Sequence, residues 1–273
     1  WEQRGDDIDG EAAGDVSGTS VSLSADGTAL AVGATHNDAS RLDGGGFWAG
    51  HARVFAWDPV DEKWVQRGDD IDGEAAYDRS GASVSLSADG TVLAVGAYYN
   101  WYNAGHARVF AWTTTTVCEP DEAEQAWRMW GTHSCDAMQA EWKVCTNEDD
   151  ANHATVMSAC PATCASYRDE PCPDKEEWEQ RGDDIEGEAA GDRSGYSVSL
   201  SADGTTLAVG AYGNDGAGSD AGHARVFAWD SDKEEWKQRG DDIDGEAAGD
   251  YSGRSVSLSA DGTALAVGAP YND

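Results

Sequence analysis

Hydrophobic and polar residues alternate along most of the chain with a period of two. In residues 20–33, valine and leucine alternate with serine, alanine and glycine, and in residues 51–57 bulky and small side chains alternate in the same way. This period is typical of β-strands, because successive side chains of a strand point to opposite faces. Asp26 and Gly27 lie between two such runs, where positive backbone angles let the chain reverse, so the segment predicts a tight hairpin.

The same pattern recurs along the chain. The phrase SVSL, followed by SADGT and LAVGA, begins at Ser20, Ser83, Ser197 and Ser255. Each full unit also contains WxQRGDDI before this phrase and GHARVFAW after a variable loop. Such a unit predicts four antiparallel strands with small or apolar side chains on both faces, which is what a propeller blade requires. A lone blade cannot bury both faces, so the copies are expected to pack side by side.

These motifs resemble a known repeat. Gly-x-Ser-Val at the start of one strand and Val267-Gly268-Ala269-Pro270 after the next resemble the FG-GAP repeat of integrin-type propellers, and SxDGTxLAVG is also similar to WD-type blades. The resemblance implies that SVSL is the innermost strand, followed by LAVGA, GHARVFAW and the next WxQRGDDI. We therefore expect an all-β protein, a β-propeller of four-stranded blades with four repeats present and the last one incomplete. A link of a longer tandem array is favoured over a four-bladed ring.

The six cysteines all lie in an insertion between two of the repeats. Their clustering within residues 118–172 predicts one small disulfide module, an oxidising compartment and hence a secreted, extracellular protein. Their order, with the phrase CPATC at residues 160–164, resembles the ShKT family of small helical disulfide modules. The expected domains are propeller blades in 1–112 and 178–273 and the insertion in 113–177. The resemblance implies the bridges Cys118 to Cys172, Cys135 to Cys160 and Cys145 to Cys164.

The charge of the chain narrows the range of partners. The sequence has 18 basic and 52 acidic residues, a formal net charge of −34. Such a surface repels phosphate backbones and anionic lipids, so neither nucleic acid nor membrane insertion is expected. No cofactor is expected. Calcium binding at Asp7, Asp9, Glu11 and Asp15 is only a weak expectation, because their spacing matches neither the EF-hand loop nor the calcium loop of integrin-type propellers. Turn formation and ion pairing are the favoured roles of these residues.

Arginine and histidine recur on the third strand of each unit. Arg53, Arg108 and Arg225 alternate with aromatic residues inside the predicted stack, where a guanidinium requires a carboxylate partner. His51, His106 and His223 are expected to be hydrogen-bonded core residues, because equivalent positions of different blades lie apart. The Arg-Gly-Asp tripeptide at Arg4 and its copies is embedded in a predicted strand and is not expected to act in adhesion. The expected carboxylate partners of the arginines are Asp6, Asp7, Asp69, Asp70, Asp183, Asp184, Asp241 and Asp242.

No catalytic motif is found, and repetition argues against catalysis, because an active site needs one asymmetric set of residues. Individual function is expected in the loops that differ, where aromatic side chains suit stacking on sugars or burial in an assembly contact. The first hypothesis is a secreted, non-enzymatic structural protein that self-associates head to tail into an extracellular fibre or surface layer. The alternative is a recognition module that binds glycans or extracellular proteins. The candidate contacts are Trp48, Tyr98, Tyr99, Trp101, Tyr102 and Tyr212, and Thr113, Thr114, Thr115 and Thr116 are candidates for O-glycosylation.

Overall fold

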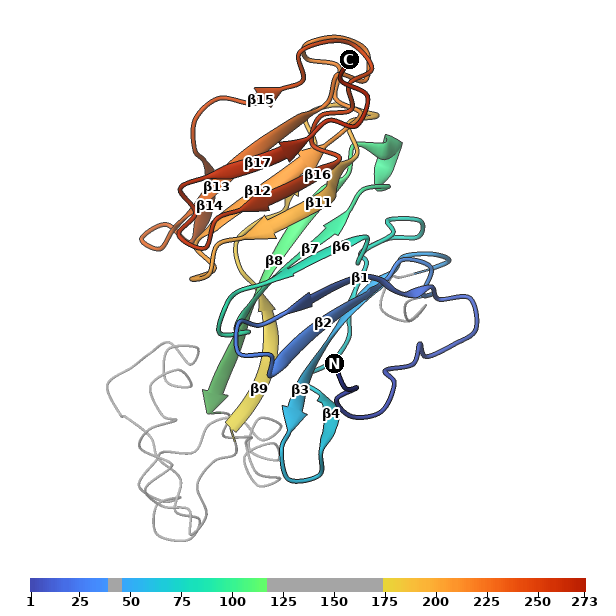
Figure 1. Cartoon of the computed structure of the whole chain (residues 1–273), viewed down its shortest axis with the longest axis vertical. Coiled ribbons are helices and arrows are strands. Elements are labelled where there is room, and N and C mark those ends of the chain that lie inside the picture. Colours follow the sequence, from blue (N-terminus) through green and yellow to red (C-terminus); the bar gives the residue numbers. More distant parts are fainter. Residues whose placement is uncertain (39–45, 117–173) are drawn as a thin grey trace, which may run out of the picture. The chain divides into compact units, whose positions relative to one another are not determined.

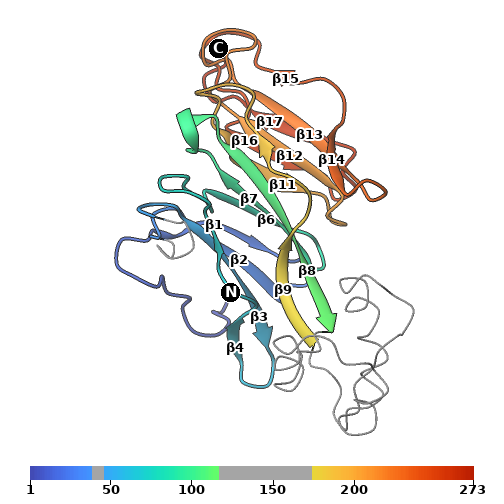
Figure 2. The same cartoon turned by 180° about the vertical axis from the view of Figure 1, so that it is seen from behind.

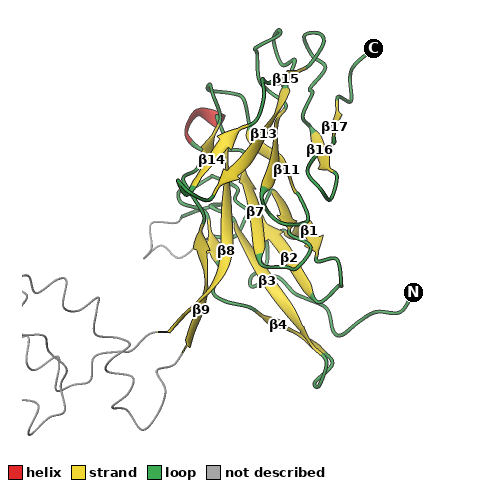
Figure 3. Ribbon diagram, turned by 90° about the vertical axis from the view of Figure 1, so that its left-hand side faces the viewer, coloured by secondary structure: helices red, strands yellow, loops and turns green. Residues whose placement is uncertain are grey.

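The computed structural model describes residues 1–38, 46–116 and 174–273. The chain divides into two compact units, 1–112 with 177–273 and 113–176. The six cysteines, and with them the expected ShKT-like module, its helices and its bridges, lie outside the described residues. In the described ranges strands predominate, and the helical content is one short turn, η1 (Trp101–Asn103) (Figure 3). None of the helices described there is long and apolar enough to cross a membrane.

The strands form separate antiparallel sheets, one for each repeat (Figure 1). None of these sheets closes on itself. The order of the strands within each sheet confirms the order expected from the motifs. Blade 1 has the order β1 (Ser17–Leu23), β2 (Ala29–Ala34), β3 (His51–Asp58) and β4 (Lys63–Gln66). Blade 2 has the order β6 (Ser83–Leu86), β7 (Val92–Ala97), β8 (His106–Thr116) and β9 (Asp174–Gln180). Blade 3 has the order β11 (Ser194–Leu200), β12 (Thr206–Ala211), β13 (His223–Asp230) and β14 (Glu235–Gln238), and blade 4 is the pair β16 (Ser255–Leu258) and β17 (Leu265–Gly268).

The outermost motif forms two short strands instead of the single strand expected from WxQRGDDI. In blade 1, β4 and β5 (Ile71–Asp72) both pair with β3, and β10 (Ile185–Glu186) and β15 (Ile243–Asp244) repeat the arrangement on β8 and β13. The break falls at the glycine of the motif, since Gly68 has φ +81° and Gly182 has φ +79°. These are left-handed conformations that end a strand and are accessible to glycine. Figure 2 shows β9 running beside β8 in blade 2.

The inner hairpins are closed by the aspartate of the SADGT phrase. In blade 3, Asp203 Oδ1 accepts hydrogen bonds from Ser201 Oγ at 2.6 Å, Thr205 N at 3.0 Å and Thr205 Oγ1 at 2.9 Å. The hydrogen bond from Ser201, with those from Thr205, lowers the pKa of Asp203, because it stabilises the carboxylate form. The same arrangement occurs in blades 1, 2 and 4, which explains why the phrase is repeated almost unchanged.

Consecutive blades meet at an interface that we call a seam, in which a face of small side chains packs on a face of larger ones. At the first seam, the alanine-rich face of blade 1 covers the valine and leucine side chains of blade 2, and the next seam has the same composition. Both faces of an inner blade are therefore buried, as the repeat pattern requires. The first seam contains Ala29, Ala31, Ala52 and Val54 of blade 1 and Val84, Leu86, Leu93, Val95 and Phe110 of blade 2.

Serine and glycine of the two inner strands connect the blades directly. Ser83 Oγ donates to the carbonyl oxygen of Gly195 at 2.8 Å, and the amide of Leu200 donates to Ser85 Oγ at 2.9 Å. A Cβ atom at Gly96 would lie only 1.9 Å from the carbonyl oxygen of Gly195. The close approach of neighbouring backbones therefore requires small residues in SVSL and LAVGA.

The outer part of each blade is held by a pair of tryptophans and one arginine. In blade 2, the rings of Trp112 and Trp178 lie 5.4 Å apart, and the Arg67 guanidinium lies 4.4 Å from the Trp112 ring. The indole of Trp178 also donates to the carbonyl oxygen of Arg67 at 2.9 Å. Arg67 is the arginine of one Arg-Gly-Asp copy, so its side chain takes part in the stacking of the blade.

Candidate functional site

The repeated phrases differ from one another at a few positions. These are the variable positions of A-A-x-D-x-S-G-x-S and the two residues after LAVGA. In several repeats they carry tyrosine or arginine, although small residues occupy the same positions in other repeats. The residues in question are Tyr77, Arg79, Tyr98, Tyr99, Arg193, Tyr196, Tyr212, Tyr251, Arg254 and Tyr271.

Some side chains of this set, together with His36 and Trp48, form a series of contacts that crosses the seam between blades 1 and 2. The rings of His36 and Trp48 lie 5.2 Å apart, and those of Trp48 and Tyr77 lie 5.8 Å apart in an edge-to-face arrangement. The Arg79 guanidinium lies 5.4 Å from the Trp48 ring and 5.1 Å from the Tyr99 ring. Arg79 therefore links the aromatic side chains of the two blades by cation–π contacts.

The second part continues through blades 2, 3 and 4 without a break. The ring of Tyr98 lies 5.8 Å from that of Tyr99 and 5.3 Å from that of Tyr196 in the next blade. The remaining steps are Tyr196 to Tyr212 at 4.6 Å, Tyr212 to Tyr251 at 5.8 Å and Tyr251 to Tyr271 at 5.4 Å. We call the contiguous set the aromatic ladder: His36, Trp48, Tyr77, Arg79, Tyr98, Tyr99, Tyr196, Tyr212, Tyr251 and Tyr271.

Backbone pairing between neighbouring blades positions the ladder. Gly50 forms a parallel bridge with Ser80, and the amide of Arg79 donates to the carbonyl oxygen of Trp48 at 3.2 Å. The amide of Tyr77 donates to the carbonyl oxygen of Phe47 at 2.9 Å. The same bridge joins Gly105 to Ser194 and Gly222 to Ser252 at the next two seams. The ladder is therefore built on hydrogen-bonded segments at the blade junctions.

Trp48 has a backbone conformation that is unfavourable for its residue type. Its φ is 56°, and the equivalent residues of the other repeats, Asn103 and Asp220, have φ of 61° and 52°. Asparagine and aspartate tolerate the left-handed region, whereas a bulky side chain there costs on the order of 1 kcal/mol. Strain of this kind persists where the surroundings hold it, and it is concentrated at binding and catalytic sites. Trp48 is thus a residue whose presence the fold does not explain.

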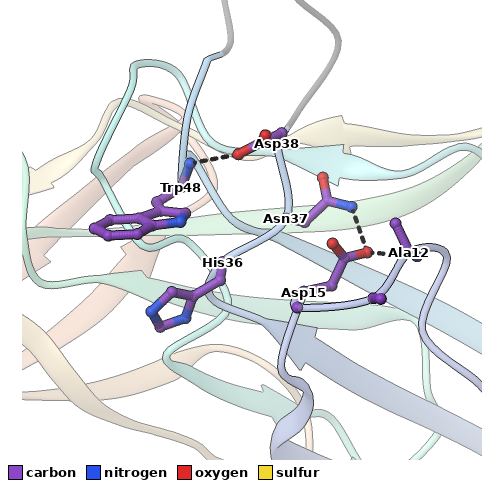
Figure 4. Close-up of a pocket in the computed structure, with 8 residues that line it drawn as sticks. Ala12, Asp15, His36, Asn37, Asp38 and Trp48 are labelled. Atoms are coloured by element: carbon purple, nitrogen blue, oxygen red, sulfur yellow. Dashed lines mark hydrogen bonds between the residues drawn. The ribbon is translucent and has the colours of Figure 1, made fainter.

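Trp48 also forms one wall of a pocket of about 260 Å³ (Figure 4). The indole is 42% exposed, and the backbone amide of Trp48 donates to Asp38 Oδ1 at 3.0 Å. At the other side of the pocket, Asp15 Oδ2 accepts from Asn37 Nδ2 at 3.1 Å and from the amide of Ala12 at 2.9 Å. An aromatic face beside carboxylate, amide and imidazole groups is an arrangement that recognises hydroxyl-rich ligands.

The structure places four of the expected contact residues in the ladder: Trp48, Tyr98, Tyr99 and Tyr212. Tyr102 is exposed at η1, where its carbonyl oxygen accepts from the amide of Gly191, and the side chain of Trp101 lies outside the described residues. The sequence expectation omitted the other six members of the ladder: His36, Tyr77, Arg79, Tyr196, Tyr251 and Tyr271. These residues could have been found by aligning the repeats, because their positions carry different residue types from one repeat to the next. O-glycosylation at Thr113 to Thr116 remains a prediction, and Thr115 Oγ1 lies 3.5 Å from the carbonyl oxygen of Lys175.

The buried arginines have different partners from those expected. Arg53 donates to the carbonyl oxygen of Asp9 at 2.6 Å and lies 4.0 Å from Glu11, rather than pairing with Asp6 and Asp7. Arg108 and Arg225 repeat this geometry with Glu74 and Glu188, so Asp69, Asp70, Asp183, Asp184, Asp241 and Asp242 are not their ion-pair partners. These glutamates all come from the GEAA segment that precedes the first strand of the arginine's own blade. The arginines that stack on tryptophan are Arg4, Arg67 and Arg181. Arg53 instead stacks on Phe55.

The four weak calcium candidates do not gather into one site. Asp7 Oδ1 accepts from Gln3 Nε2, the carbonyl of Asp9 binds Arg53, and Asp15 closes a turn through the amide of Ala12. Glu11 instead faces His51, with Glu11 Oε2 3.7 Å from His51 Nδ1. Burial, followed by the charge of Asp70, raises the pKa of Glu11.

The comparisons with known proteins support the repeat type. The FG-GAP repeat model matches residues 186–227, which confirms the FG-GAP character that the motifs indicated. No curated protein matches the chain. Similar solved structures include a Bacteroides uniformis protein named as a 6-phosphogluconolactonase, with 12% identity over 91% of this chain and a TM-score of 0.44. They also include the periplasmic gluconolactonase of Pseudomonas aeruginosa, with 18% identity over 92% of this chain and a TM-score of 0.36.

A third similar structure is the hydrazine synthase of Kuenenia stuttgartiensis, with 11% identity over 93% of this chain and a TM-score of 0.31. The chain spans 46% of the Bacteroides uniformis protein, 64% of the Pseudomonas aeruginosa protein and 71% of the Kuenenia stuttgartiensis protein. Together with the repeat match, the blades describe a propeller-like repeat fold, which is a scaffold for binding or assembly.

Proposed function

We propose that this protein is an extracellular, non-enzymatic recognition module that binds neutral carbohydrate along the aromatic ladder. The observation that carries the proposal is Trp48, an exposed indole held in a left-handed conformation at the head of the ladder, beside a polar pocket. Aromatic rings stack on the apolar faces of sugar rings, and carboxylate and amide groups beside them accept and donate hydrogen bonds to hydroxyls.

The length and charge of the site define the ligand class. Because the ladder crosses three seams in a continuous series of contacts, it suits an extended oligosaccharide better than a single sugar. The net charge of −34 disfavours uronic acid or sulfated polymers, since a strongly anionic protein repels them. Neutral glucans, mannans and galactans are therefore the expected ligands.

Replacing Trp48 by asparagine should separate binding from folding. Repeat 2 has asparagine at the equivalent position, Asn103, with nearly the same φ. We expect Trp48→Asn to weaken glycan binding at least about tenfold through loss of the stacking surface, and to leave the free energy of unfolding unchanged or raised by up to about 1 kcal/mol through relief of strain. Isothermal titration with soluble neutral glucans, mannans and galactans, together with urea denaturation, measures both.

Trp1→Asn provides the control, because Trp1 is a fully exposed tryptophan outside the ladder. It should leave glycan affinity unchanged. If the wild-type protein binds none of these neutral polymers, or if Trp1→Asn weakens binding as much as Trp48→Asn does, the proposal is wrong.

A second candidate function is head-to-tail assembly, which is favoured by the outer face of blade 1. Val21 and Leu23 are 63% and 55% exposed, whereas Val198 and Leu200, their equivalents in blade 3, are 8% and 7% exposed. Inside the seams, this face is covered by small alanine side chains of the neighbouring blade. Ala264 and Ala266 of blade 4, which are equivalent to part of that cover, are exposed, and in the proposed assembly they pack on Val21 and Leu23 of a second copy.

Leu23→Asp tests this assembly. An aspartate on the uncovered face should abolish association, because a carboxylate cannot be buried against alanine without a partner. Analytical ultracentrifugation over a concentration series should show larger species for the wild type and a monomer for Leu23→Asp. Val60→Asp is the matched control, since Val60 is exposed in the turn between β3 and β4. A monomeric wild type at all concentrations would contradict self-assembly and leave carbohydrate recognition as the function.

A further inference from the structure

Blades 1 and 3 each contain a buried imidazole nitrogen surrounded by carboxylates. His51 is 1% exposed, and its Nδ1 has no hydrogen-bond partner. Around this atom lie Asp70 Oδ2 at 3.6 Å, Glu11 Oε2 at 3.7 Å and Asp72 Oδ1 at 4.0 Å. An unpaired buried polar atom costs free energy, so this arrangement requires an explanation.

The arrangement recurs two repeats later with the same geometry. His223 is also 1% exposed, with an Nδ1 that lacks a hydrogen-bond partner. This atom lies 3.7 Å from Asp242 Oδ2, 3.9 Å from Glu188 Oε2 and 4.0 Å from Asp244 Oδ1. The repetition indicates a property of the repeat rather than an accident of one side chain. The sequence expectation of hydrogen-bonded core histidines therefore does not describe Nδ1 of these two residues.

From this geometry we infer that each of these two clusters binds a divalent transition-metal ion, of which Zn²⁺ is the best match, through one histidine nitrogen and the surrounding carboxylates. A tetrahedral Zn²⁺ ion with bonds of about 2.0–2.1 Å separates its ligand atoms by roughly 3.4 Å. The observed separations of 3.6–3.9 Å between the nitrogen and the Glu and Asp oxygens approach this value and need only a small closure. An imidazole ligand favours Zn²⁺ over Ca²⁺ or Mg²⁺, which prefer oxygen.

The charges around the nitrogen are mainly negative. The carboxylates of Glu11, Asp70 and Asp72 lie within 4.0 Å of His51 Nδ1, and the Arg53 guanidinium lies 4.0 Å from Glu11. The cluster around His223 has the same arrangement, with Arg225 lying 3.8 Å from Glu188. A concentration of carboxylates of this kind attracts a divalent cation.

Outer residues already orient the carboxylates as supporting groups do in metal sites. Gln66 Nε2 donates to Asp70 Oδ1 at 2.8 Å, which leaves Asp70 Oδ2 directed at the histidine. Gln238 Nε2 donates to Asp242 Oδ1 at 2.6 Å in the same way. Hydrogen bonds of this kind fix ligand orientation and strengthen metal binding.

Blade 2 provides an internal comparison. Glu74, His106 and Asp184 also lie close together, but His106 Nδ1 is engaged by Asn100 Nδ2 at 3.0 Å, and the buried nitrogen of this ring without a partner is Nε2. We therefore assign metal sites to the clusters of His51 and His223 and not to that of His106. Each histidine acts with the carboxylates that surround it, so the large distance between equivalent histidines is no obstacle.

Metal analysis of the whole chain, dialysed against Zn²⁺ in the presence of excess Mg²⁺, tests this assignment. Two tightly bound zinc equivalents are expected. Glu11→Gln and Glu188→Gln should each remove one equivalent, whereas Glu74→Gln should remove none. These glutamates are about half exposed, so the substitutions are compatible with folding. Absence of tightly bound zinc, or loss of an equivalent from Glu74→Gln but from neither of the others, overturns the assignment.

Thermal unfolding supplies a second measurement, in which the effect of Glu11→Gln on the melting temperature is expected to change sign when Zn²⁺ is added. Without metal, Glu11→Gln should raise the melting temperature, because it removes repulsion between Glu11 and its neighbouring carboxylates. With Zn²⁺ present, the same variant should melt below the wild type, because it has lost one of the sites whose occupancy stabilises the fold. A variant that melts above the wild type under both conditions contradicts a metal site at His51.

Discussion

Replacing Gly210 by alanine is expected to lower the free energy of unfolding by about 3 kcal/mol or more, the upper range for overpacking a rigid contact. A Cβ atom at Gly210 would lie 2.0 Å from the carbonyl oxygen of Gly253 in the next blade. This oxygen belongs to the backbone and also accepts a hydrogen bond from Ser197 Oγ at 2.8 Å, so it cannot move without opening the seam. Urea denaturation followed by tryptophan fluorescence measures the loss.

Gly268→Ala is the matched control for this prediction. Gly268 is the equivalent glycine of blade 4, and a Cβ there would meet Ser255 Oγ of its own blade at 2.3 Å but no atom of another blade. A serine hydroxyl can rotate away, so we expect a loss of no more than about 1 kcal/mol. Equal losses for the two variants would show that the close contact between blades is not what requires glycine.

Leu207→Ala is expected to destabilise the protein by about 3 kcal/mol, within the range found for cavities in buried cores. Leu207 is completely buried in the second seam, where it packs among valine and leucine side chains of blade 3 and the small face of blade 2. Backbone hydrogen bonds on both sides of β12 prevent the seam from collapsing onto the cavity.

Leu30→Ala is the comparison for Leu207→Ala. Leu30 has the same place in blade 1, on the face that no other blade covers in the described residues, and it is partly exposed. The same truncation should cost about 1 kcal/mol there, because less apolar surface is removed from water on folding. Thermal unfolding of both variants distinguishes the cases, and a loss at Leu30 as large as that at Leu207 would mean that its face is covered in solution.

The blade architecture could be predicted from the sequence because its determinants are local and repeated. Alternation with a period of two, the Asp-Gly hairpins and the four copies of SVSL and LAVGA specified the strands and their order. The break in the outer strand was missed, although the glycine of WxQRGDDI marked its position. In a single sequence such a glycine is read as part of the strand, because its positive φ becomes visible only in the structure.

The partners of charged residues could not be predicted in the same way. The aspartate pair next to Arg53 in the predicted sheet, Asp69 and Asp70, was the obvious choice of partner, but Arg53 lies 4.0 Å from Glu11, which comes from the segment before β1. Likewise, nothing in the spacing of Glu11, His51 and Asp70 shows that these side chains converge, since they come from three separate segments of the chain. Long-range side-chain geometry depends on such small backbone rotations, which local patterns do not encode.

The aromatic ladder was accessible from the sequence only in part. The variable loops drew attention to Trp48, Tyr98, Tyr99 and Tyr212, which do belong to it. Tyr77, Arg79, Tyr196 and Tyr251 stand within well-repeated phrases, where each looks like a surface substitution, and His36 and Tyr271 follow LAVGA. Their common location became evident once the bridges between Gly50 and Ser80 and their equivalents showed that these positions meet at every seam.

The ladder is built from residues that differ between the repeats, and this has a consequence for how such proteins diversify. A duplicated repeat inherits the full set of scaffold contacts, while its few open positions are free to change. A gene that encodes repeats of this kind can therefore acquire new binding specificity by substitutions at single ladder positions, without changes to the contacts that hold the blades together.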